Sequence, residues 1–541
     1  MWFQEYNPIG NEILSGLVAV IPIVVFLLGL TVFKLKGTIA ASLTLISALL
    51  ITTFVYKMPI DAALLSLILG VGKALWPIGY IIIMAVWLYK MSVKSGKFDI
   101  VGKTIIGISN DQRIQLLVIG FCFLSFLEGV SGLGVPIAIC SALLVSLGFH
   151  PIKAAGFCLI SNAATGVFAT VGIGVFTGAE VGNMPVSELS ALTALSVPVI
   201  AFIVPFLLIF IQDGVKGVKE IFPALITVSL VFSVFQFLIA TFVGPELTNI
   251  IPSLLAMLTL ALVMRKWKPK NVYYEPNADR TKIAEKLSFK QLLRGWSPFY
   301  FLTIVIGIWS LPFFSKLFAE NGPLSFTTLH IKIPNLHERI IQSAPIALEE
   351  TAMPAIFHWD IISSTGTAIL VAAIITSTVF SEITMKDRVG LFGETLKELK
   401  TPLIIIILVL SFASLSNYSG LSASIGLALA NTGMLFPLFS PLLGWLGVFL
   451  TGSVVNNNAL FAGLQVVTAK QLALNPSLFV AANTVGGAMA KPIAPTSLAI
   501  AAAAVGQNGK ESEILSFTLK YSLLLITIIC IINFVLAYTM T

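Results

Sequence analysis

Residues 126–136 read FLEGVSGLGVP, and they interrupt a long apolar run with glycines, one acid and a proline. A related stretch, residues 449–458, reads FLTGSVVNNN. Glycine favours turns and proline removes a backbone donor, so neither stretch should continue as a regular helix. Non-helical backbone at membrane depth survives only inside protein or beside a water-filled cavity. The two stretches therefore predict re-entrant hairpins over 115–147 and 445–469.

Each predicted hairpin is followed at a similar distance by a second motif. Asn162-Ala-Ala-Thr-Gly166 comes 33 residues after Gly129, and Asn483-Thr-Val-Gly-Gly487 comes 31 residues after Gly452. The order FLxG, hairpin-sized gap, NxxxG thus occurs in both halves and indicates an internal repeat. We expect discontinuous helices over 152–176 and 478–505, broken near 165–174 and 486–495.

The composition places these hairpins in an all-α membrane protein. Of 541 residues, 57% are hydrophobic and only 11% are charged, whereas soluble domains carry about 25% charged residues. Apolar runs of about 20 residues, enough to cross a bilayer as a helix, recur along the chain. The clearest runs are 13–33, 38–55, 74–89, 222–243, 250–264, 299–314 and 522–538. We predict about 12 spanning helices plus the two hairpins; counting the hairpins as ordinary spans would give about two more crossings.

The charged loops set the orientation of the chain. The net charge is +7, and the basic residues cluster in short loops between spans, which argues against nucleic-acid binding. Loops 90–113, 265–295 and 382–400 are the basic ones and are expected in the cytoplasm. The weakly apolar, more acidic segment 315–362 is expected outside, as is the N-terminus. The first hairpin then enters from inside and the second from outside, as in the inverted repeats of transporters.

These assignments divide the chain into four parts of a multi-pass membrane protein, which the resemblance described next implies to lie in the bacterial inner membrane. Residues 1–113 are expected to be scaffold spans, and 114–212 the first hairpin and broken helix of a transport region. Residues 213–401 supply more scaffold, with the cytoplasmic loop 265–295 and the external loop 315–362. Residues 402–541 supply the second hairpin, the second broken helix and the last span.

The chain resembles the bacterial lactate permease family over nearly its whole length. The matching stretches are 34–37 (KLKG), 111–113 (DQR), 120–123 (GFCF), 126–129 (FLEG), 416–422 (SNYSGLS), 444–453 (GWLGVFLTGS), 458–461 (NALF), 482–484 (ANT) and 509–512 (GKES). The resemblance implies uptake of lactate, and often glycolate, together with a proton. It also implies membership of the ion-transporter superfamily, whose members have inverted repeats with hairpins and, in several cases, an elevator-like movement.

The chain departs from the family pattern around the predicted interruptions. The departures are Gly166 and Gly174 in the first broken helix, Val454 and Asn456–Asn458 in the second hairpin, and Pro492, Ala494 and Thr496 in the second broken helix. Because they fall in the expected site, the acid carried, its enantiomer and the coupled ion stay open.

Two charges in apolar surroundings are the sharpest candidates for function. Glu128 lies at the glycine-rich turn, where a charged group at membrane centre costs about 2.5–3.5 kcal/mol on insertion scales. It is either a proton carrier, since burial favours the neutral form of a carboxyl group, or a structural partner of backbone donors. Lys491, between Asn483 and Pro495, either offers a charge to a substrate carboxylate or extends its ammonium group to water.

Uncharged polar residues at the interruptions suit the hydroxyl and carboxylate of a 2-hydroxy acid. For any one of them, capping a helix end is the alternative role. The candidates are Asn162, Asn483, Thr484, Ser453, Asn456, Asn457 and Asn458, with Ser131 and Thr165 as weaker ones.

The sequence favours a secondary active transporter, a proton symporter of lactate-like monocarboxylates, over other classes. Glycolate or another small organic anion with different ion coupling is the alternative. No nucleophile–base pair or metal-ligand spacing is visible, so neither an enzyme nor a cofactor or metal site is expected, and paired broken helices fit alternating access better than an open channel. The four cysteines lie in apolar runs without CxxC spacing and are expected to be free. The sequence does not decide whether the protein forms a homodimer.

Overall fold

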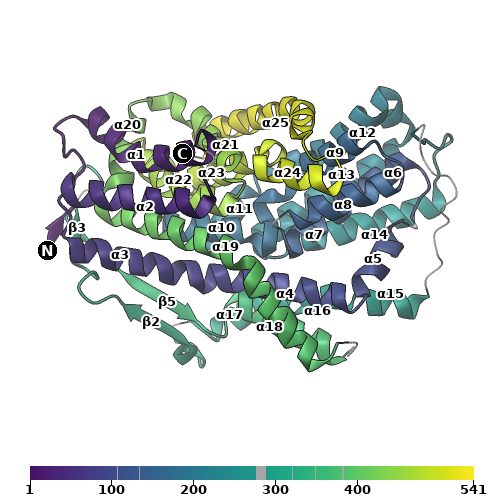
Figure 1. Cartoon of the computed structure of the whole chain (residues 1–541), viewed down its shortest axis with the longest axis horizontal. Coiled ribbons are helices and arrows are strands. Elements are labelled where there is room, and N and C mark those ends of the chain that lie inside the picture. The colour runs from purple at the N-terminus through teal and green to yellow at the C-terminus, as the bar shows by residue number, and fades with distance from the viewer. Residues whose placement is uncertain are drawn as a thin grey trace.

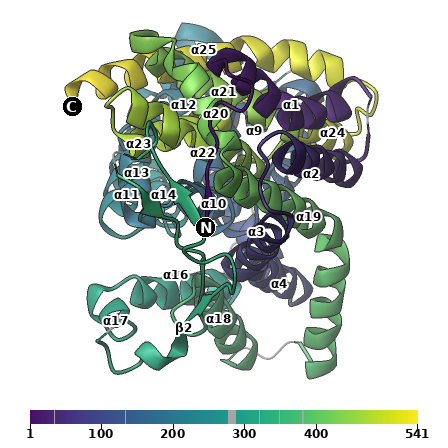
Figure 2. The ribbon, with the colours of Figure 1, turned by 90° about the vertical axis from the view of Figure 1, so that its left-hand side faces the viewer.

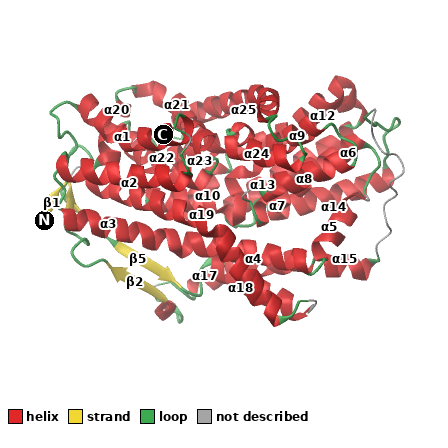
Figure 3. Cartoon of the chain, viewed as in Figure 1, coloured by secondary structure: helices red, strands yellow, loops and turns green. Residues whose placement is uncertain are grey.

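A computed structural model describes residues 1–540 of the chain, apart from 34, 107, 133, 276–287, 320, 348 and 380–382. Most of the described chain is helical, and many helices run along the long axis of the molecule (Figure 1). The few strands gather toward one end, beside the N-terminus (Figure 3). Lys34, Glu320 and the central part of the basic loop 265–295 were used in the predictions above, but they lie outside the described residues.

Ten helical stretches within the described ranges are long and apolar enough to cross a membrane. They are Glu12–Leu30, Gly37–Phe54, Ile60–Lys94, Gln112–Val130, Pro151–Gly182, Val186–Glu220, Phe222–Phe242, Met385–Ser419, Gly433–Thr451 and Glu511–Thr539. Three of them belong to hairpins or broken helices, as described below. The all-α membrane fold is confirmed, whereas the number of about 12 spans stays a prediction.

The helices outside the two repeats surround them. Those of the N-terminal part are α1 (Glu12–Thr31), α2 (Gly37–Phe54), α3 (Ile60–Lys73), α4 (Tyr80–Lys94) and α5 (Lys97–Ile106). The central ones are α11 (Val186–Thr193), α12 (Val197–Glu220), α13 (Phe222–Phe242), α14 (Ile250–Lys266), α15 (Phe289–Gly295), α16 (Ser297–Trp309), α17 (Pro312–Lys316) and α18 (Thr365–Val379). The last ones are α19 (Met385–Ser419), α20 (Leu421–Ala430) and α25 (Glu511–Thr539).

One end of the molecule, here called the outer end, joins the N-terminus to the segment predicted to be external. Strand β1 (Trp2–Phe3) pairs with β3 (Ile340–Gln342), and β3 pairs with β4 (Thr351–Ala352). A separate ribbon pairs β2 (Thr328–Lys332) with β5 (Ile356–Asp360). Figure 2 looks onto this end and shows the N-terminus beside the strands. The sequence placed both segments on the same side, and the structure agrees.

The opposite end, here called the inner end, carries α5, α15 and the last turn of α12 (Figure 1). Arg113 is almost fully buried there and pairs with Asp111 at 2.9 Å, Asp213 at 2.8 Å and Glu220 at 2.7 Å. A buried guanidinium is tolerated when such partners satisfy its donors. The network fixes the start of the first hairpin against the end of α12.

The first predicted hairpin is a helical hairpin that starts and finishes at the inner end. One arm runs from α6 (Gln112–Gln115) through a π-helical stretch (Leu116–Phe123) to α7 (Leu124–Val130), and α8 (Val135–Ser146) forms the other arm. Gln112 Nε2 donates to Leu147 O over 2.8 Å, so the two ends lie side by side. The arm boundaries agree with the predicted 115–147 to within three residues.

The second hairpin enters from the outer end, but it is longer than predicted. Its arms are α21 (Phe436–Thr451) and α22 (Val454–Gln471), so it begins before residue 445. Ser440 Oγ donates to Gln465 Oε1 over 2.8 Å between the arms, and Gln471 Nε2 donates to Pro345 O of the outer segment over 2.8 Å. The hairpins thus enter from opposite ends, which confirms the inverted arrangement.

Both predicted discontinuous helices are confirmed. The first consists of α9 (Pro151–Thr165), a 3₁₀ turn (Gly166–Phe168) and α10 (Ala169–Gly182). The second consists of α23 (Pro476–Met489), a 3₁₀ turn (Lys491–Ile493) and α24 (Pro495–Ala504). We call α6–α10 the first unit and α21–α24 the second unit.

Candidate functional site

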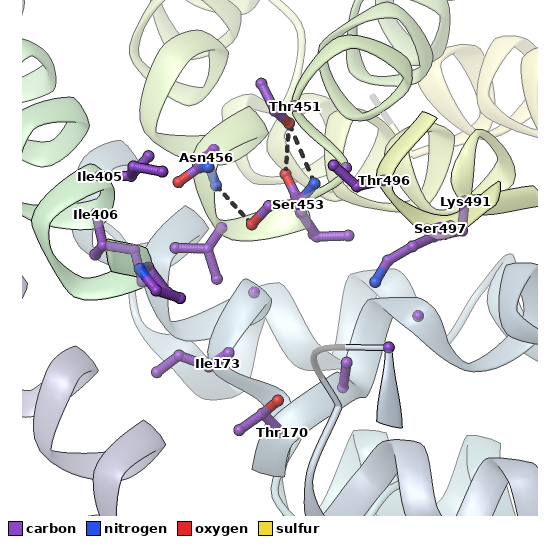
Figure 4. A pocket seen from close by; sticks show the side chains of 18 of the residues that line it. Thr170, Ile173, Ile405, Ile406, Thr451, Ser453, Asn456, Lys491, Thr496 and Ser497 are labelled. Atoms are coloured by element: carbon purple, nitrogen blue, oxygen red, sulfur yellow. Dashed lines mark hydrogen bonds between the residues drawn. The ribbon is translucent and has the colours of Figure 1, made fainter. Parts of the chain in front are cut away.

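The tips of both hairpins and both helix breaks meet around one cavity of about 300 Å³ (Figure 4). Walls from α4 and α19 complete it. The lining residues are Ile82, Gly134, Ile137, Gly166, Ala169, Thr170, Ile173, Gly174, Thr401, Pro402, Ile405, Ile406, Thr451, Gly452, Ser453, Val454, Val455, Asn456, Lys491, Thr496, Ser497 and Ile500. Opposed interruptions of two units therefore enclose one pocket with mostly apolar walls and a few polar groups, as in typical small-molecule sites.

The first hairpin turns where glycine permits it. Gly132 and Gly134 have φ of 55° and 84°, a region that residues with a side chain rarely adopt. A Cβ atom at Gly132 would also collide with Thr170 Oγ1, and one at Gly134 would collide with Ile500. Pro136 follows in the first turn of α8, where its missing N–H costs no hydrogen bond. The tip thus packs directly against both broken helices.

The second hairpin turns at Gly452, which has φ of 69°. Ser453 then caps α22, because its Oγ accepts from the backbone N–H of Asn456 over 3.3 Å. Thr451 Oγ1 donates to Gly447 O over 2.7 Å and lies 3.1 Å from Ser453 O. The polar groups of Thr451, Ser453 and Asn456 thereby face the cavity in Figure 4.

Amide side chains satisfy the carbonyl groups that the first break sets free. Asn249 Nδ2 donates to Thr165 O over 2.7 Å, and Gln236 Nε2 donates to Ala164 O over 3.4 Å. Helix ends leave such carbonyls without an intrahelical partner, so buried ends need donors from elsewhere. On the far side of the break Thr170 and Val171 have positive φ, and Thr170 Oγ1 donates to Ser131 O at the hairpin tip over 3.1 Å.

Hydroxyl groups of α25 perform the same task at the second break. Ser522 Oγ donates to Met489 O over 2.6 Å, and Thr518 Oγ1 donates to Pro492 O over 2.8 Å. Ser522 Oγ also accepts from Trp445 Nε1 over 3.0 Å, which connects the break to the first arm of the second hairpin. The unwound backbone around Lys491 is therefore held from outside the unit.

Lys491 and Glu128 form an ion pair across the two units. Their Nζ and Oε1 atoms lie 3.6 Å apart, with side-chain exposures of 11% for the lysine and 0% for the glutamate. Neither carboxylate oxygen of Glu128 has a hydrogen-bond partner, and the same holds for both side-chain polar atoms of Asn162. A Cβ atom on Gly166 would lie 3.3 Å from both Asn162 Oδ1 and Lys491 Cε, so this amide is a close neighbour of the lysine.

A hydrogen-bonded amide network joins the second hairpin to the second broken helix. Asn458 Nδ2 donates to Gly174 O over 2.8 Å and approaches Thr484 Oγ1 at 2.9 Å. Asn458 Oδ1 accepts from Asn483 Nδ2 over 2.8 Å, and Asn457 Nδ2 donates to Asn483 O over 3.1 Å. Apart from Asn457 Oδ1, which has no partner, these side-chain groups are hydrogen-bonded, so the network fixes packing within the unit and against α10.

The structure separates the predicted site residues into two sets. Lys491, Ser453 and Asn456 line the cavity. The others lie behind its wall or in the interfaces just described: Glu128, Asn162, Asn457, Asn458, Asn483, Thr484, Ser131 and Thr165.

The sequence analysis missed several polar residues of the site. Thr170, Thr401, Thr451 and Ser497 line the cavity, as does Thr496, which the sequence analysis named only as a departure from the family pattern. Asn249 and Gln236 serve the first break, and Ser522 and Thr518 serve the second. Buried amides such as Gln236 inside an apolar span were a detectable signal, because polar side chains there need a reason.

Several departures from the family pattern contact one another or the second tip. A Cβ atom on Gly174 would lie 2.8 Å from Val454 Cγ1, and one on Gly166 would lie 3.2 Å from Lys491 Cγ. Thr496 Oγ1 lies where a Cβ on Gly452 would be. Small residues on the first broken helix thus leave room for larger ones opposite.

The described residues offer no metal-binding cluster of three or more His, Cys, Asp or Glu. All four cysteines, Cys122, Cys140, Cys158 and Cys530, are free and buried. The polar side-chain groups that line the cavity are the ammonium group of Lys491, the hydroxyl groups of serines and threonines, and the amide of Asn456.

The chain is similar in sequence to known permeases. The family model described as L-lactate permease matches residues 15–540. An L-lactate permease of Halalkalibacterium halodurans is 46% identical over 99% of both chains. The glycolate permease GlcA of Escherichia coli is 43% identical over 100% of this chain and 99% of its own. The solved structure of Neisseria gonorrhoeae MtrF, an antimetabolite efflux pump by its title, aligns with 89% of this chain and 81% of its own at 14% sequence identity. The TM-score is 0.41, which is too low to support an inference.

Proposed function

Because this chain belongs to the L-lactate permease family, we propose that it imports lactate or a related 2-hydroxy monocarboxylate by secondary active transport coupled to protons. It is a multi-pass protein of the bacterial cell membrane, in keeping with its bacterial relatives and ten apolar helical stretches. The observation that carries the proposal is one lysine, paired with a buried glutamate, in a small cavity between two broken helices.

The cavity suits a small monoanion. A volume of about 300 Å³ is at the lower limit of ligand pockets, and a water molecule takes about 30 Å³. An acid with six non-hydrogen atoms fits there with a few waters. Lys491 is the lone charged residue among the lining residues, so it matches one carboxylate and no more. In the proposed complex, Ser453 and Asn456 bind the 2-hydroxyl group, and the isoleucines of α4, α10 and α19 surround the carbon chain.

The pair of Lys491 and Glu128 supplies a means of coupling. A substrate carboxylate on Lys491 competes with Glu128 for the same ammonium group. Glu128 then keeps a buried charge with neither an ion-pair partner nor a hydrogen-bond donor, and in this proposal it is the group that carries the proton. One proton and one monoanion cross together without net charge. The pH gradient therefore drives accumulation.

Uptake of radiolabelled lactate into proteoliposomes with an imposed pH gradient tests this function. The reconstituted protein should accumulate lactate when the outside is acidic and should lose the accumulation when a protonophore is added. Uptake that does not depend on the gradient would contradict proton coupling. Absence of uptake would contradict lactate as the substrate.

The variant Glu128→Gln tests the proton site itself. It keeps the size of the side chain but cannot exchange a proton, so pH-driven accumulation should be lost while lactate–lactate exchange persists. Glu188→Gln is the matched control, because Glu188 is an exposed carboxyl group in the first turn of α11. If Glu128→Gln accumulates lactate as the control does, Glu128 is structural.

Glycolate is the second candidate substrate, favoured by the 43% identity to the glycolate permease of E. coli. Glycolate lacks the methyl group of lactate, so the isoleucine walls would contribute less to its binding. Competition by unlabelled lactate enantiomers, glycolate, pyruvate and malate at equal concentration ranks the substrates. A sodium gradient imposed in place of the pH gradient tests the alternative ion.

A further inference from the structure

The cavity between the units extends toward the inner end of the molecule. From the second break its lining continues to Ser497 and Ile500 on α24, and from the first hairpin tip to Ile137 on α8. Thr401 and Pro402 contribute from the part of α19 that lies on the inner side. On the outer side, the lining ends at Ile173 and Gly174 of α10 and at Asn456 of α22.

Contacts close the outer side of the cavity between α10 and the surrounding helices. Lys73 Nζ on α3 lies 2.9 Å from Glu180 Oε1 on α10. Asn417 Nδ2 on α19 donates to Val181 O of α10 over 3.2 Å. The ion pair joins the first unit to a helix of the predicted scaffold, and the Asn417 contact joins it to the part of α19 that was predicted to belong to the second transport region. Figure 2 shows α3, α10 and α19 together at this end.

The ion pair joins two helices, α3 and α10, that are displaced along their axes, whereas Asn417 and Val181 both lie within two residues of the outer ends of α19 and α10. Lys73 is the last residue of α3, so all of α3 lies outward of the ion pair. Glu180, by contrast, is two residues from the outer end of α10. The first unit is therefore placed toward the inner end relative to α3.

Other charged groups near the pair do not replace it. His358 of β5 lies within electrostatic range of Lys73, Glu180, Asp360 and His330, and Asp360 lies within range of Glu180. Burial, with a contribution from His330, lowers the pKa of His358, so this imidazole is neutral at pH 7. Lys73 and Glu180 are thus left as each other's partners, with side-chain exposures of 28% and 36%.

We infer that Lys73 and Glu180, with Asn417, form the outer gate of the substrate path, closed here while the cavity faces the cytoplasm. The inference rests on the proposed transport function. When the first unit moves outward relative to α3 and α19, the ion pair must break and the path opens between these helices. Lys73 and Glu180 act as positioning residues: they contact no substrate and set the balance between inward-facing and outward-facing states.

Access of a membrane-impermeant maleimide from outside intact cells measures this balance without any transported substrate. Ile173→Cys places a reporter thiol on the cavity wall of α10, and the four native cysteines are buried. Lys73→Glu puts two carboxylates together and should raise labelling of this reporter about fivefold, the population shift expected from losing one partly exposed ion pair. The swap Lys73→Glu with Glu180→Lys restores an attraction and should return labelling to the original level.

Lys90 and Glu398 provide the matched control, because they form an ion pair between α4 and α19, neither of which belongs to the first unit. Lys90→Glu, alone or with Glu398→Lys, should leave reporter labelling unchanged. Equal labelling with and without Lys73→Glu, or no restoration in the swap, would overturn the gate.

Lactate uptake is measured separately on the same variants without the reporter. Lys73→Glu should slow uptake and the swap should recover it. If labelling changes as expected but the protein takes up no lactate, the gate is supported and the proposed substrate is refuted. If uptake is normal and labelling is unchanged, the gate is refuted and the proposed transport function is unaffected.

Discussion

The first and second units have the same architecture, but the charged side chains that they place at the shared cavity have opposite signs. The first contributes Glu128 behind its hairpin tip, and the second contributes Lys491 at its break. Within the first unit, Glu128 and Asn162 lack hydrogen-bond partners. Within the second, the amides of the hairpin bind the broken helix through Asn458 and Asn483, and the buried atoms without a partner are the single amide oxygens of Asn456 and Asn457.

The difference shows how a repeated fold can become specialised. A unit held together by its own amides keeps the hairpin fixed relative to the lysine. A unit with an unsatisfied buried carboxylate is ready for a change of partner or of protonation, because unpaired buried polar groups are costly. We therefore expect substitutions in the second unit to affect stability and those around Glu128 to affect coupling.

Removing the cation should have the largest effect on stability. Lys491→Met leaves Glu128 buried without its ion-pair partner, which should lower the free energy of unfolding by about 3 kcal/mol. The double variant Lys491→Met with Glu128→Gln removes the uncompensated charge and should recover most of the loss. Thermal unfolding of the purified protein in detergent measures both.

Lys73→Met is the control for that experiment, because it removes a lysine from a pair that is about one-third exposed. It should cost less than about 1 kcal/mol. A double variant as unstable as Lys491→Met alone would show that the lysine acts through packing rather than charge.

Two asparagines of α22, two residues apart, should separate support from binding. Asn458→Ala removes the bonds to Gly174 O and to Asn483, which should cost about 2 kcal/mol because buried groups lose their partners. Asn456 lines the cavity, and its Oδ1 has no partner. Asn456→Ala should leave the unfolding temperature nearly unchanged and raise the KM for lactate. Equal effects of both variants on stability and on KM would contradict the division.

The smallest effects are expected from the groups that satisfy the two breaks. Asn249→Ala and Ser522→Ala each leave one buried carbonyl without its donor, at about 1 kcal/mol. Asn249→Ala should also lower the pH-driven rate, because it loosens the unit that contains Glu128. Ser522→Ala should mainly raise KM, and Ser522→Thr should restore it by keeping the hydroxyl. Identical kinetic changes in Asn249→Ala and Ser522→Ala would mean that the units are not specialised.

The sequence by itself determined the membrane class, the two interruptions and their inverted order. Those features follow from local properties: apolar length, the freedom of glycine at Gly134 and Gly452, proline at Pro136 and Pro495, and the charges of short loops. Glu128 and Lys491 were also recognisable, because a charge in an apolar run is costly wherever the chain places it.

Only the tertiary structure brought Glu128 to Lys491 and divided the polar residues into cavity wall and internal support. Asn458, Asn483 and Thr484 were predicted as substrate ligands, and the structure adds that they hydrogen-bond one another. The roles of Asn249 and Ser522 were not predicted, because the sequence does not indicate which backbone carbonyl a polar side chain will reach. Such pairings depend on contacts between segments far apart in the chain, and no local pattern of side chains encodes them.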